Sequence, residues 1–332
     1  MLRRKRQHFF ARICVVGLGG GGVTAVNQMM ANNVSGVNFV VVDSDPEALN
    51  RSRAPTRIHV SSGERSGAAA SKAHPLLREA LAGADMVFLI GGLGGRTGTF
   101  LAPAVAALAR EQQALVIAIM TCPFAFEGAK RTQRARVGVE QLRKWATTLV
   151  VVPNDRLLET AGGELSFHET YRLANDVWQQ SIEGINELVN SYGLVNVDFA
   201  DIRTVMGMGG ASLIATGRGC GPQRAQVAAS AATHSSLLGI TIDGARALVF
   251  NISGGPDMGL HEVEEAAAII RERAHPAAYV IFGATINFSL EDEIAITVIA
   301  TGCGWEAPRL RPPARAVAQL EPVVPLLGQP GG

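Results

Sequence analysis

The stretch RICVVGLGGGG, residues 12–22, joins a short apolar run to a glycine cluster that satisfies the pattern GxGxxG. Such a run predicts a buried strand, and the glycines predict a loop that a phosphate can approach closely because no Cβ stands in the way. Asp43 lies 21 residues beyond Gly22, at the end of the next predicted strand. By spacing alone this is a dinucleotide-binding fingerprint with an acid placed for a ribose hydroxyl. The alternative is a tight turn rich in glycine.

Short apolar runs alternate with longer amphipathic stretches over the first half of the chain. This alternation is typical of a parallel sheet covered by helices, so we predict an α/β fold. The predicted strands are Arg12–Gly17, Phe39–Asp43, Met86–Ile90, Leu115–Thr121 and Leu149–Val152. The predicted helices lie near Ala25–Asn32, Pro75–Leu81, Pro103–Glu111 and Arg131–Trp145.

One long stretch with few helix breakers, Phe167–Ser191, separates this region from a second one. Its apolar residues recur as in a helix, which would be roughly 37 Å long at 1.5 Å per residue. Beyond it we predict a second, smaller sheet, made of Ala247–Ser253, Ala278–Asn287 and Glu293–Thr301, with a helix at Gly259–Glu272. Residues 304–332 hold six of the fifteen prolines and are predicted to form a mostly disordered tail.

Composition excludes several classes of protein. Thirty basic residues against 29 acidic ones leave a net charge of +1, which gives no support for a nucleic-acid partner. The four cysteines are far apart without a CxxC pair, which disfavours a disulfide framework or a zinc site and favours the cytoplasm. No apolar run reaches the ~20 residues of a transmembrane helix, so we expect no membrane insertion. The N-terminus resembles a signal peptide, but it runs straight into the glycine motif, and we interpret it as a basic arm.

A second glycine cluster, GGLGGRTGT at residues 91–99, follows the third predicted strand and precedes another helix. It is not a Walker A loop, because Ile90 stands where the first glycine of GxxxxGK[ST] belongs. Two strand–glycine–helix units on one parallel sheet put two phosphate cradles at the same edge. A dehydrogenase needs only the first, whereas a triphosphate, which has more charge to neutralise, uses both.

Two acids follow the long predicted helix in the stretch NVDFAD, residues 196–201. Asp198 and Asp201 lie on one face if a helix starts there, and such carboxylates can polarise water or hold Mg²⁺. Either one could equally cap that helix, and spacing alone leaves both interpretations open. A bare triphosphate would repel them, so catalysis requires that a cation and the cradles neutralise the phosphates.

Four motifs, in order along the chain, resemble the tubulin/FtsZ family. GGRTGTF at 94–100 is similar to the signature GGGTGTG, TCPFAFEG at 121–128 resembles the PFxFEG loop, and VPND at 152–155 resembles the PND turn. NVDFADIRTVM at 196–206 matches the catalytic loop almost letter for letter. The resemblance covers about residues 11–303 and implies the tubulin/FtsZ fold.

The resemblance also implies a division into domains. It gives a Rossmann-like, parallel-sheet GTP-binding domain at residues 11–166, a central helix at 167–195, and a smaller α/β domain at 196–303 with the catalytic loop at its start. A basic arm at 1–10 and the proline-rich tail at 304–332 flank them.

The implied function is that of a cytoplasmic GTPase at the division site. Such a protein polymerises head to tail and forms the cell-division ring, with a second FtsZ or other division proteins as further partners. It binds GTP or GDP, and Mg²⁺ is held by phosphates and water rather than by protein ligands. In the filament the catalytic residues act in trans on the γ-phosphate of the adjoining subunit and activate the attacking water.

Carried over by position, the nucleotide site has three parts. The residues expected around the phosphates are Gly20, Gly21, Gly22, Val23, Thr24, Gly94, Gly95, Thr97, Gly98 and Thr99. Glu127 and Arg131 would meet the ribose, Asn154 and Asn175 would contact the guanine edge, and Tyr171 would lie against the base, where phenylalanine is usual. The catalytic residues in trans would be Asn196, Asp198 and Asp201.

Several positions depart from the family pattern. Arg96 and Phe100 replace the third and the closing glycine of the signature, and Val23-Thr24 stand where Gly-Asn is usual. A cation at position 96 could bind the γ-phosphate, or its side chain could equally obstruct the cradle. The segment 61–75 is shorter than the γ-phosphate-sensing loop, and the tail shows no recognisable version of the peptide that binds membrane tethers. These departures keep open a weakly hydrolysing paralogue with a structural or regulatory role in filaments. A further alternative is an NAD-dependent oxidoreductase. This interpretation is based on the first glycine cluster and Asp43 alone, and it gives the other motifs no role.

Overall fold

The computed structural model describes residues 10–60, 75–160, 166–191, 193–209, 211–235 and 240–303. The proline-rich tail, the segment 61–74 and all but the last residue of the expected basic arm lie outside the described residues. Within the part of the chain that is described, no helix is both long and apolar enough to span a bilayer.

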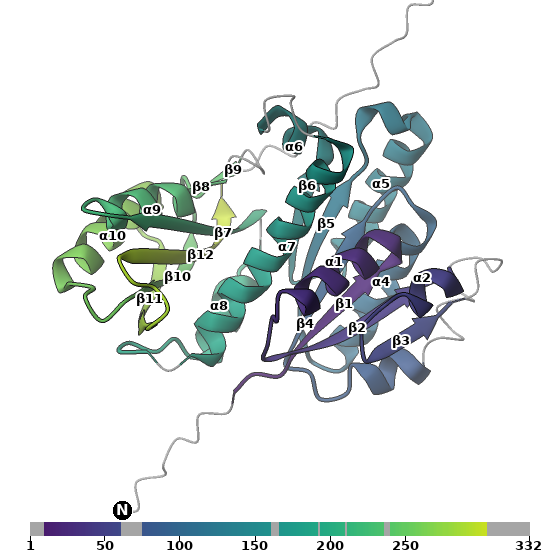
Figure 1. The fold of residues 1–332 in the computed structure, drawn as a ribbon, viewed down its shortest axis with the longest axis horizontal. Helices are drawn as coiled ribbons and strands as arrows, with labels where there is room; N and C mark the ends of the chain where they lie inside the picture. The colour runs from purple at the N-terminus through teal and green to yellow at the C-terminus, as the bar shows by residue number, and fades with distance from the viewer. Residues whose placement is uncertain are drawn as a thin grey trace, which may run out of the picture.

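The first domain is built on a six-stranded parallel sheet with the order β3-β2-β1-β4-β5-β6 (Figure 1). Its strands are β1 (Ile13–Leu18), β2 (Val37–Asp43), β3 (Thr56–His59), β4 (Met86–Gly92), β5 (Leu115–Cys122) and β6 (Thr148–Pro153). The chain adds β2 and β3 on one side of β1 and then returns to add β4, β5 and β6 on the other side. The strand order therefore reverses between β1 and β4, and ligands of open α/β sheets bind at the carboxyl ends of the strands at such a point.

Helices cover both faces of this sheet, as the burial of alternate β1 side chains shows. Ile13 and Val15 belong to one apolar cluster with residues of α1 (Gly19–Ala31) and α7 (Phe167–Asn190). Cys14 and Val16 belong to the other, with residues of α4 (Arg96–Glu111) and α5 (Ala129–Leu142). The shorter elements are α2 (Pro46–Asn50), a helix at residues 75–80, η1 (Ala125–Glu127) and α6 (Asn154–Thr160).

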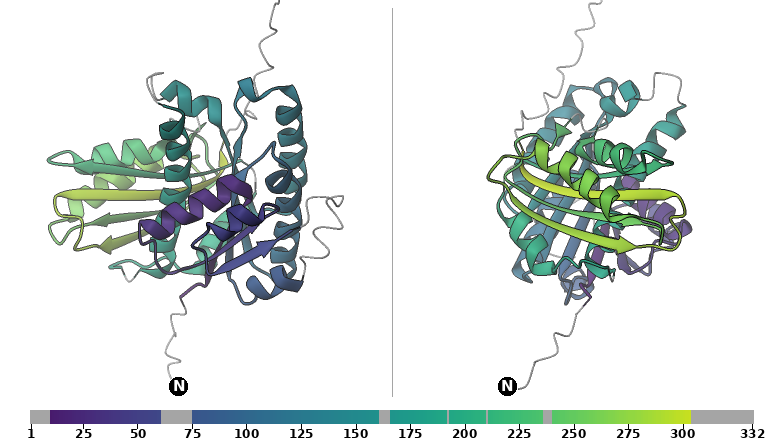
Figure 2. Two further views of the ribbon diagram at one scale, coloured as in Figure 1. Left: turned by 45° about the vertical axis from the view of Figure 1, so that its right-hand side comes forward. Right: turned by 90° about the vertical axis from the view of Figure 1, so that its left-hand side faces the viewer.

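The second domain is a four-stranded mixed sheet with the order β11-β10-β12-β7. Its elements are α8 (Phe199–Gly207), β7 (Ala211–Cys220), α9 (Arg224–Thr233), β8 (His234–Ser235), β9 (Ile240–Thr241), β10 (Ala247–Gly254), α10 (Leu260–Arg273), β11 (Tyr279–Ile286) and β12 (Glu293–Cys303). β10 and β11 are parallel, whereas β12 runs antiparallel to both of its neighbours. Figure 2 shows this domain, in green and yellow, standing beside the first one.

The long helix α7 lies between the two sheets (Figure 1). It begins with a capping box in which Ser166 and Glu169 satisfy each other's backbone N–H groups, which fixes its start. Trp178, Ile182 and Ile185 are buried along it, and a Cβ at Gly184 would lie 2.6 Å from the Thr297 hydroxyl of β12. The predicted helix at Phe167–Ser191 and the predicted order of two unequal α/β domains are thus confirmed.

The predicted starts of three helices were wrong. α1 begins at Gly19 rather than near Ala25, and α4 begins at Arg96 rather than near Pro103. Glycine has a low helix propensity, so the sequence indicated loops where the chain is already helical. α5 differs less, since it spans Ala129–Leu142.

Strand β7 and helix α9 were missed altogether because they contain small residues where a strand and a helix usually carry bulky ones. A Cβ at Gly217 of β7 would lie 2.0 Å from the Ala228 carbonyl oxygen of α9, and one at Gly219 would lie 2.2 Å from that of Arg224. α9 therefore packs with its backbone almost directly on the strand. That packing requires glycine in β7. Glycine interrupts the run of β-branched and apolar residues from which a strand is predicted, so β7 was not recognised.

This close approach predicts a large cost for Gly217→Ala. The added methyl group would meet backbone atoms of α9, which move only with the whole helix, so the free energy of unfolding should fall by about 1–3 kcal/mol. Gly207→Ala is the matched control, because a Cβ there meets no described atom within 4 Å, and it should leave stability unchanged or raise it by up to about 1 kcal/mol. Denaturant unfolding of both variants measures the difference, and equal stabilities would contradict the packing argument.

Candidate functional site

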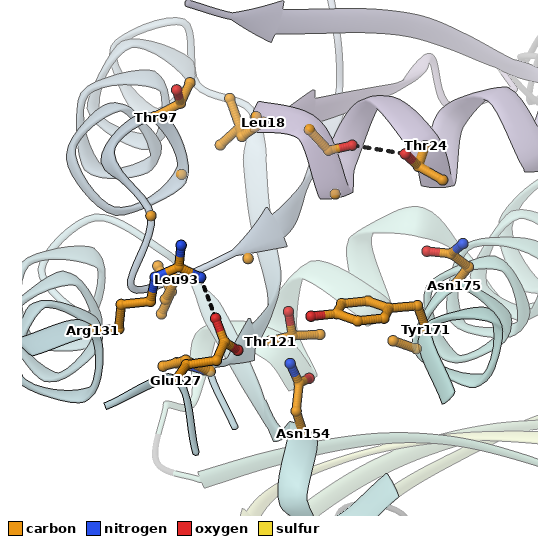
Figure 3. Close-up of a pocket in the computed structure, with 18 of the residues that line it drawn as sticks. Leu18, Thr24, Leu93, Thr97, Thr121, Glu127, Arg131, Asn154, Tyr171 and Asn175 are labelled. Carbon is orange, nitrogen blue, oxygen red and sulfur yellow. Dashed lines mark hydrogen bonds and ion pairs between the residues drawn. The ribbon is translucent and has the colours of Figure 1, made fainter. Parts of the chain in front are cut away.

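A cavity of about 520 Å³ opens at the carboxyl ends of β1, β4 and β5, next to the point where the strand order reverses. Its wall combines the starts of α1 and α4, the β5–α5 connection, the start of α6 and the first half of α7 (Figure 3). Eleven of the expected nucleotide-site residues line it: Gly20, Gly21, Thr24, Gly95, Thr97, Gly98, Glu127, Arg131, Asn154, Tyr171 and Asn175.

Two helix N-termini open into this cavity. The N-cap residues of α1 and α4, Leu18 and Gly95, form no side-chain cap bond, and neither helix has an acidic residue in its first turn. Among the described residues, a Cβ at Gly20 or Gly95 would meet no atom within 4 Å, and one at Gly21 would meet only the Gly92 nitrogen at 3.9 Å. The backbone N–H groups and the positive ends of both helix dipoles thus border open space, which is the arrangement that binds phosphate.

Four expected residues, Gly22, Val23, Gly94 and Thr99, are absent from the cavity wall and support it from behind. A Cβ at Gly22 would lie 2.8 Å from the Ile90 carbonyl oxygen of β4, so this glycine lets α1 sit against the sheet. Val23 is buried in the core. The Gly94 N–H donates to the hydroxyl of Thr99, which is 2% exposed, at 2.8 Å, so these two residues hold the second glycine loop in shape.

The wall also contains residues that sequence reasoning did not assign to it. These are Leu18, Gly19, Gly92, Leu93, Thr121, Pro123, Ala174 and Trp178. Most are immediate neighbours of motif residues, and their position follows from the strand ends on which the motifs lie. Arg96, which the sequence placed beside the phosphates, also lines the wall. Trp178 follows Tyr171 by two helical turns, and its indole N–H donates to the Ile119 carbonyl of β5 at 2.8 Å.

One end of the cavity is suited to a planar base with polar edges. The Oδ1 atom of Asn154 is buried and accepts no hydrogen bond from any described residue, so it is available to an N–H donor of a ligand. The Asn175 amide donates to Gln28 Oε1 at 2.9 Å. Tyr171 packs edge-on against Phe124, with ring centroids 5.7 Å apart. Figure 3 shows Tyr171, Asn154 and Asn175 on the opposite side of the cavity from Thr97.

Between these two ends, Glu127 and Arg131 form an ion pair. Glu127 also accepts the Phe124 N–H at 2.9 Å, which anchors the β5–α5 connection. Burial, with a further contribution from Glu127, raises the pKa of the Tyr171 hydroxyl, and Arg131 opposes this shift. The Tyr171 hydroxyl therefore stays protonated at neutral pH and can donate a hydrogen bond to a ligand.

Asp43 does not occupy the place that the dinucleotide fingerprint predicts for it. Its carboxylate is 5% exposed and lies outside the cavity wall. Oδ1 accepts the Ser44 N–H at 2.6 Å and lies 3.3 Å from the Thr97 hydroxyl. Asp43 therefore ties the end of β2 to the start of α4 instead of facing a ribose.

The three expected catalytic residues lie at the other end of α7. The Asp198 side chain accepts the Ala200 N–H at 3.1 Å and caps α8, and the Asn196 side chain accepts the Gly193 N–H at 2.7 Å. Asp201 lies half-buried in the first turn of α8. Helical rise puts roughly 28 Å between Tyr171 and Asn190 along α7. A single chain therefore does not bring the acids to its own cavity.

Comparison with known proteins agrees with the fold. Residues 12–162 match the Tubulin/FtsZ family, GTPase domain, and residues 210–304 match the FtsZ family, C-terminal domain. The structure superposes on an FtsZ dimer from M. jannaschii with a TM-score of 0.80 and 34% sequence identity over 89% of each chain. The chain belongs to the FtsZ family.

More distant relatives share the fold of this FtsZ-family protein. CetZ2 from Haloferax volcanii superposes with a TM-score of 0.73 at 19% identity, over 88% of this chain and 93% of that chain. CetZ from Methanosaeta thermophila gives 0.73 at 18% identity, over 88% and 86%. At these identities the likeness shows the fold alone. The matched GTPase domain implies that the protein binds and hydrolyses GTP.

The Thr99–Gly94 bond gives a prediction about the cavity wall. Thr99→Val keeps the shape of the side chain but leaves the buried Gly94 N–H without an acceptor, so the free energy of unfolding should fall by about 1–3 kcal/mol. Hydrogen exchange of the Gly94 amide should be faster in this variant than in the wild type. Thr132→Val is the control. The Thr132 hydroxyl on α5 is half-buried, and its hydrogen bond to the Gly128 carbonyl is long, at 3.4 Å, so its loss should cost little. Equal effects of the two variants would show that the bond does not hold the loop.

Proposed function

We propose that this FtsZ-family protein binds GTP in the cavity of one subunit and hydrolyses it with carboxylates of the next subunit in a head-to-tail filament. One observation carries the proposal: the phosphate-binding helix ends and the acids of NVDFAD lie at opposite ends of α7. In its biological setting, the filament is a component of the division ring in the cytoplasm. A second FtsZ and other division proteins are the partners that the family membership favours.

The cavity residues divide the nucleotide between them. Gly20 and Gly21, with Thr24 beside them, face the inner phosphates, and Gly95, Thr97 and Gly98 face the outer one. The unpartnered Oδ1 of Asn154 accepts an N–H of the guanine edge, Asn175 completes that contact, and Tyr171 lies against the base. Glu127 and Arg131 meet the ribose. Gly22, Val23, Gly94 and Thr99 act indirectly, by holding the two loops in place.

Mg²⁺ enters this proposal with the nucleotide. No group of three or more His, Cys, Asp or Glu side chains is gathered for a metal ion in the described part of the chain. Phosphate oxygens and water would hold the ion, and when bound it offsets phosphate charge as a carboxylate of the next subunit approaches.

In the proposed composite site the loop residues have different tasks. Asp201 accepts the proton of the attacking water, and Asn196 helps to place that water. Asp198 uses one carboxylate oxygen to cap α8, and so it fixes the helix turn that carries Asp201 while its other oxygen faces the partner. In the proposed domain division, residues 11–166 contain the cavity, 167–195 form the helix that separates the two sites, and 196–303 begin with the catalytic loop.

Relatives give independent support for assembly. The M. jannaschii FtsZ structure is described as a dimer, and the Haloferax volcanii CetZ2 structure as a protofilament with bound GTPγS. Arg96 in the cavity wall favours a second candidate, a weakly hydrolysing family member with a structural or regulatory role in filaments.

Phosphate release from GTP over a range of protein concentrations, with sedimentation in parallel, tests the proposal. A composite site predicts turnover per subunit that rises above a threshold concentration at which the protein also begins to pellet. Turnover per subunit that is the same at every concentration would overturn catalysis in trans. GTP binding without turnover at any concentration would favour the second candidate.

A complementation experiment locates the two halves of the site. Asp201→Ala should bind GTP normally but lose turnover and give longer-lived filaments, because its cavity is intact. Gly95→Val should fold, since a Cβ there meets no atom of the described residues within 4 Å, and should lose GTP binding because the side chain occupies the cradle. Mixing the two inactive variants should restore part of the turnover, since a cavity of one then meets Asp201 of the other. A mixture as inactive as its components, in filaments shown to contain both, contradicts the composite site.

A further inference from the structure

The amide of Asn175, at the base end of the cavity, is held from behind by two further side chains. Asn175 lies on α7, is 8% exposed, and donates from Nδ2 to Gln28 Oε1 of α1 at 2.9 Å. Gln28 in turn donates from Nε2 to Asp176 Oδ1 at 2.9 Å. Gln28 and Asp176 lie outside the cavity wall, whereas Asn175 is part of it. These three side chains, here called the Asp176 relay, connect a carboxylate to the cavity.

The carboxylate fixes the direction of every hydrogen bond in the relay. Because a carboxylate only accepts hydrogen bonds, Gln28 can bind Asp176 only through its NH₂ group. The Gln28 oxygen is then left for Asn175, which must offer its own NH₂ group. The Asn175 Oδ1 atom remains, and it accepts no hydrogen bond from any described residue. Figure 3 shows this oxygen on the cavity side of the amide.

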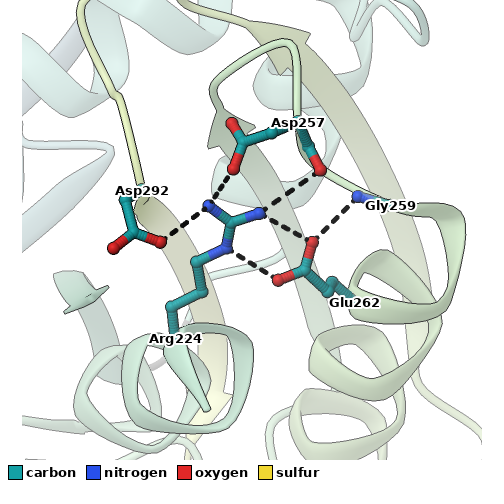
Figure 4. A network of polar contacts seen from close by, with 5 residues as sticks. All are labelled: Arg224, Asp257, Gly259, Glu262 and Asp292. Carbon is teal, nitrogen blue, oxygen red and sulfur yellow. Dashed lines mark hydrogen bonds and ion pairs between the residues drawn. The ribbon is translucent and has the colours of Figure 1, made fainter. Parts of the chain in front are cut away.

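The network around Arg224 shows what a charged side chain does when it serves the fold alone. Arg224 is 5% exposed and binds the carboxylates of Asp257 and Glu262, and Glu262 also accepts the Gly259 N–H at 2.8 Å (Figure 4). All of these partners belong to the second domain, so the network fastens α9 to the connection between β10 and α10. The Asp176 relay differs because its last member faces a ligand cavity.

A site that presents hydrogen-bond acceptors selects a base by its N–H donors. Asn154 Oδ1, which is buried and has no donor among the described residues, lies at the same end of the cavity as Asn175. Guanine carries two neighbouring donors on one edge, N1–H and the 2-amino group. Hypoxanthine keeps N1–H but lacks the amino group, and adenine has an acceptor at N1. A site built for N–H donors rejects a base that lacks them, because its buried acceptors are then left unpaired.

We propose that Asp176 and Gln28 are positioning residues that set the guanine selectivity of the cavity, by turning the Asn175 oxygen toward the N–H donors of the base. This inference rests on the proposed function, in which the cavity binds guanine nucleotides. Neither Asp176 nor Gln28 touches the nucleotide. Both act through Asn175, whose amide would otherwise present its NH₂ group or its oxygen to the base.

Affinities for GDP and inosine diphosphate, each measured by competition with a fluorescent guanine nucleotide, test the relay without the complication of turnover. The wild type should bind GDP about tenfold more tightly, because inosine diphosphate leaves an acceptor of the site unpaired. Asp176→Asn should reduce this preference to about threefold or less. An asparagine at position 176 can donate to Gln28 as well as accept from it, so the relay then runs in either direction.

The double variant Gln28→Glu/Asp176→Asn exchanges the carboxylate and the amide at almost constant shape and charge. The carboxylate at position 28 again accepts from Asn175 Nδ2, so the preference for GDP should return to about the wild-type value. This recovery separates an effect on base recognition from a general loss of packing between α1 and α7. A double variant with no more preference than Asp176→Asn would overturn the proposal.

A second chain of the same composition on the same pair of helices provides the matched control. Asn32 donates to Gln179 Oε1 at 2.7 Å, and Gln179 donates to Glu183 Oε1 at 3.0 Å. None of these three residues lines the cavity. Glu183→Gln should therefore leave the preference for GDP unchanged.

Three further outcomes are decisive. An equal loss of preference in Glu183→Gln, or an unchanged preference in Asp176→Asn, would overturn the role of the relay. A wild-type protein that binds GDP and inosine diphosphate equally well would also overturn it, while leaving nucleotide binding intact. A wild-type protein that binds neither GTP nor GDP would refute the proposed function itself.

Discussion

The close approach of helix backbone to strand backbone is the constraint on which the rest of this structure depends. A Cβ at Gly98 of α4 would lie 2.2 Å from the Gly92 carbonyl oxygen of β4, and a Cβ at Gly17 of β1 would lie 2.5 Å from that of Gly22 in α1. Both helices therefore begin directly on the strands that precede them. Gly20 and Gly95, by contrast, border open space, since a Cβ there would meet no described atom within 4 Å. Each glycine cluster thus both seats a helix on the sheet and exposes its N-terminus to a ligand.

The long helix α7 converts this local arrangement into a property of the whole molecule. Its first half lines the cavity, and its second half is tied to the other sheet through Glu187, which accepts the Ser253 hydroxyl at 2.8 Å. Ser253 accepts the Asn251 amide, and Asn251 in turn accepts the Thr285 hydroxyl at 3.2 Å. Hydrogen-bonded side chains in a buried interface resist sliding. The helix therefore holds the cavity and the acidic loop at a fixed separation.

The sequence predicted the features that depend on local pattern and missed those that depend on packing. Five of the six strands of the first sheet and the helix α7 follow from apolar periodicity, and the cavity follows from glycines at the ends of β1 and β4. The short edge strand β3 was not predicted. The starts of α1 and α4 did not follow, because the dihedral freedom of glycine hides a helix whose register the sheet imposes. β7 was missed because α9 demands Gly217 and Gly219 in it. Asp43 has the spacing of the acid in a dinucleotide-binding fingerprint, yet its carboxylate accepts hydrogen bonds from the Ser44 N–H and the Thr97 hydroxyl instead of a ribose.

Electrostatics gives a reason for the distance between the cradle and the acids. A nucleoside triphosphate is a polyanion, and a carboxylate beside its terminal phosphate would be repelled, with the pKa of the carboxyl group raised. A cavity wall with two helix N-termini binds such an anion best when Asp198 and Asp201 are far away. On the proposed mechanism, the surface buried on assembly then supplies the free energy that brings the acids against the bound phosphates. Binding and hydrolysis make opposite electrostatic demands on one site, and dividing that site between two subunits lets each demand be met in turn.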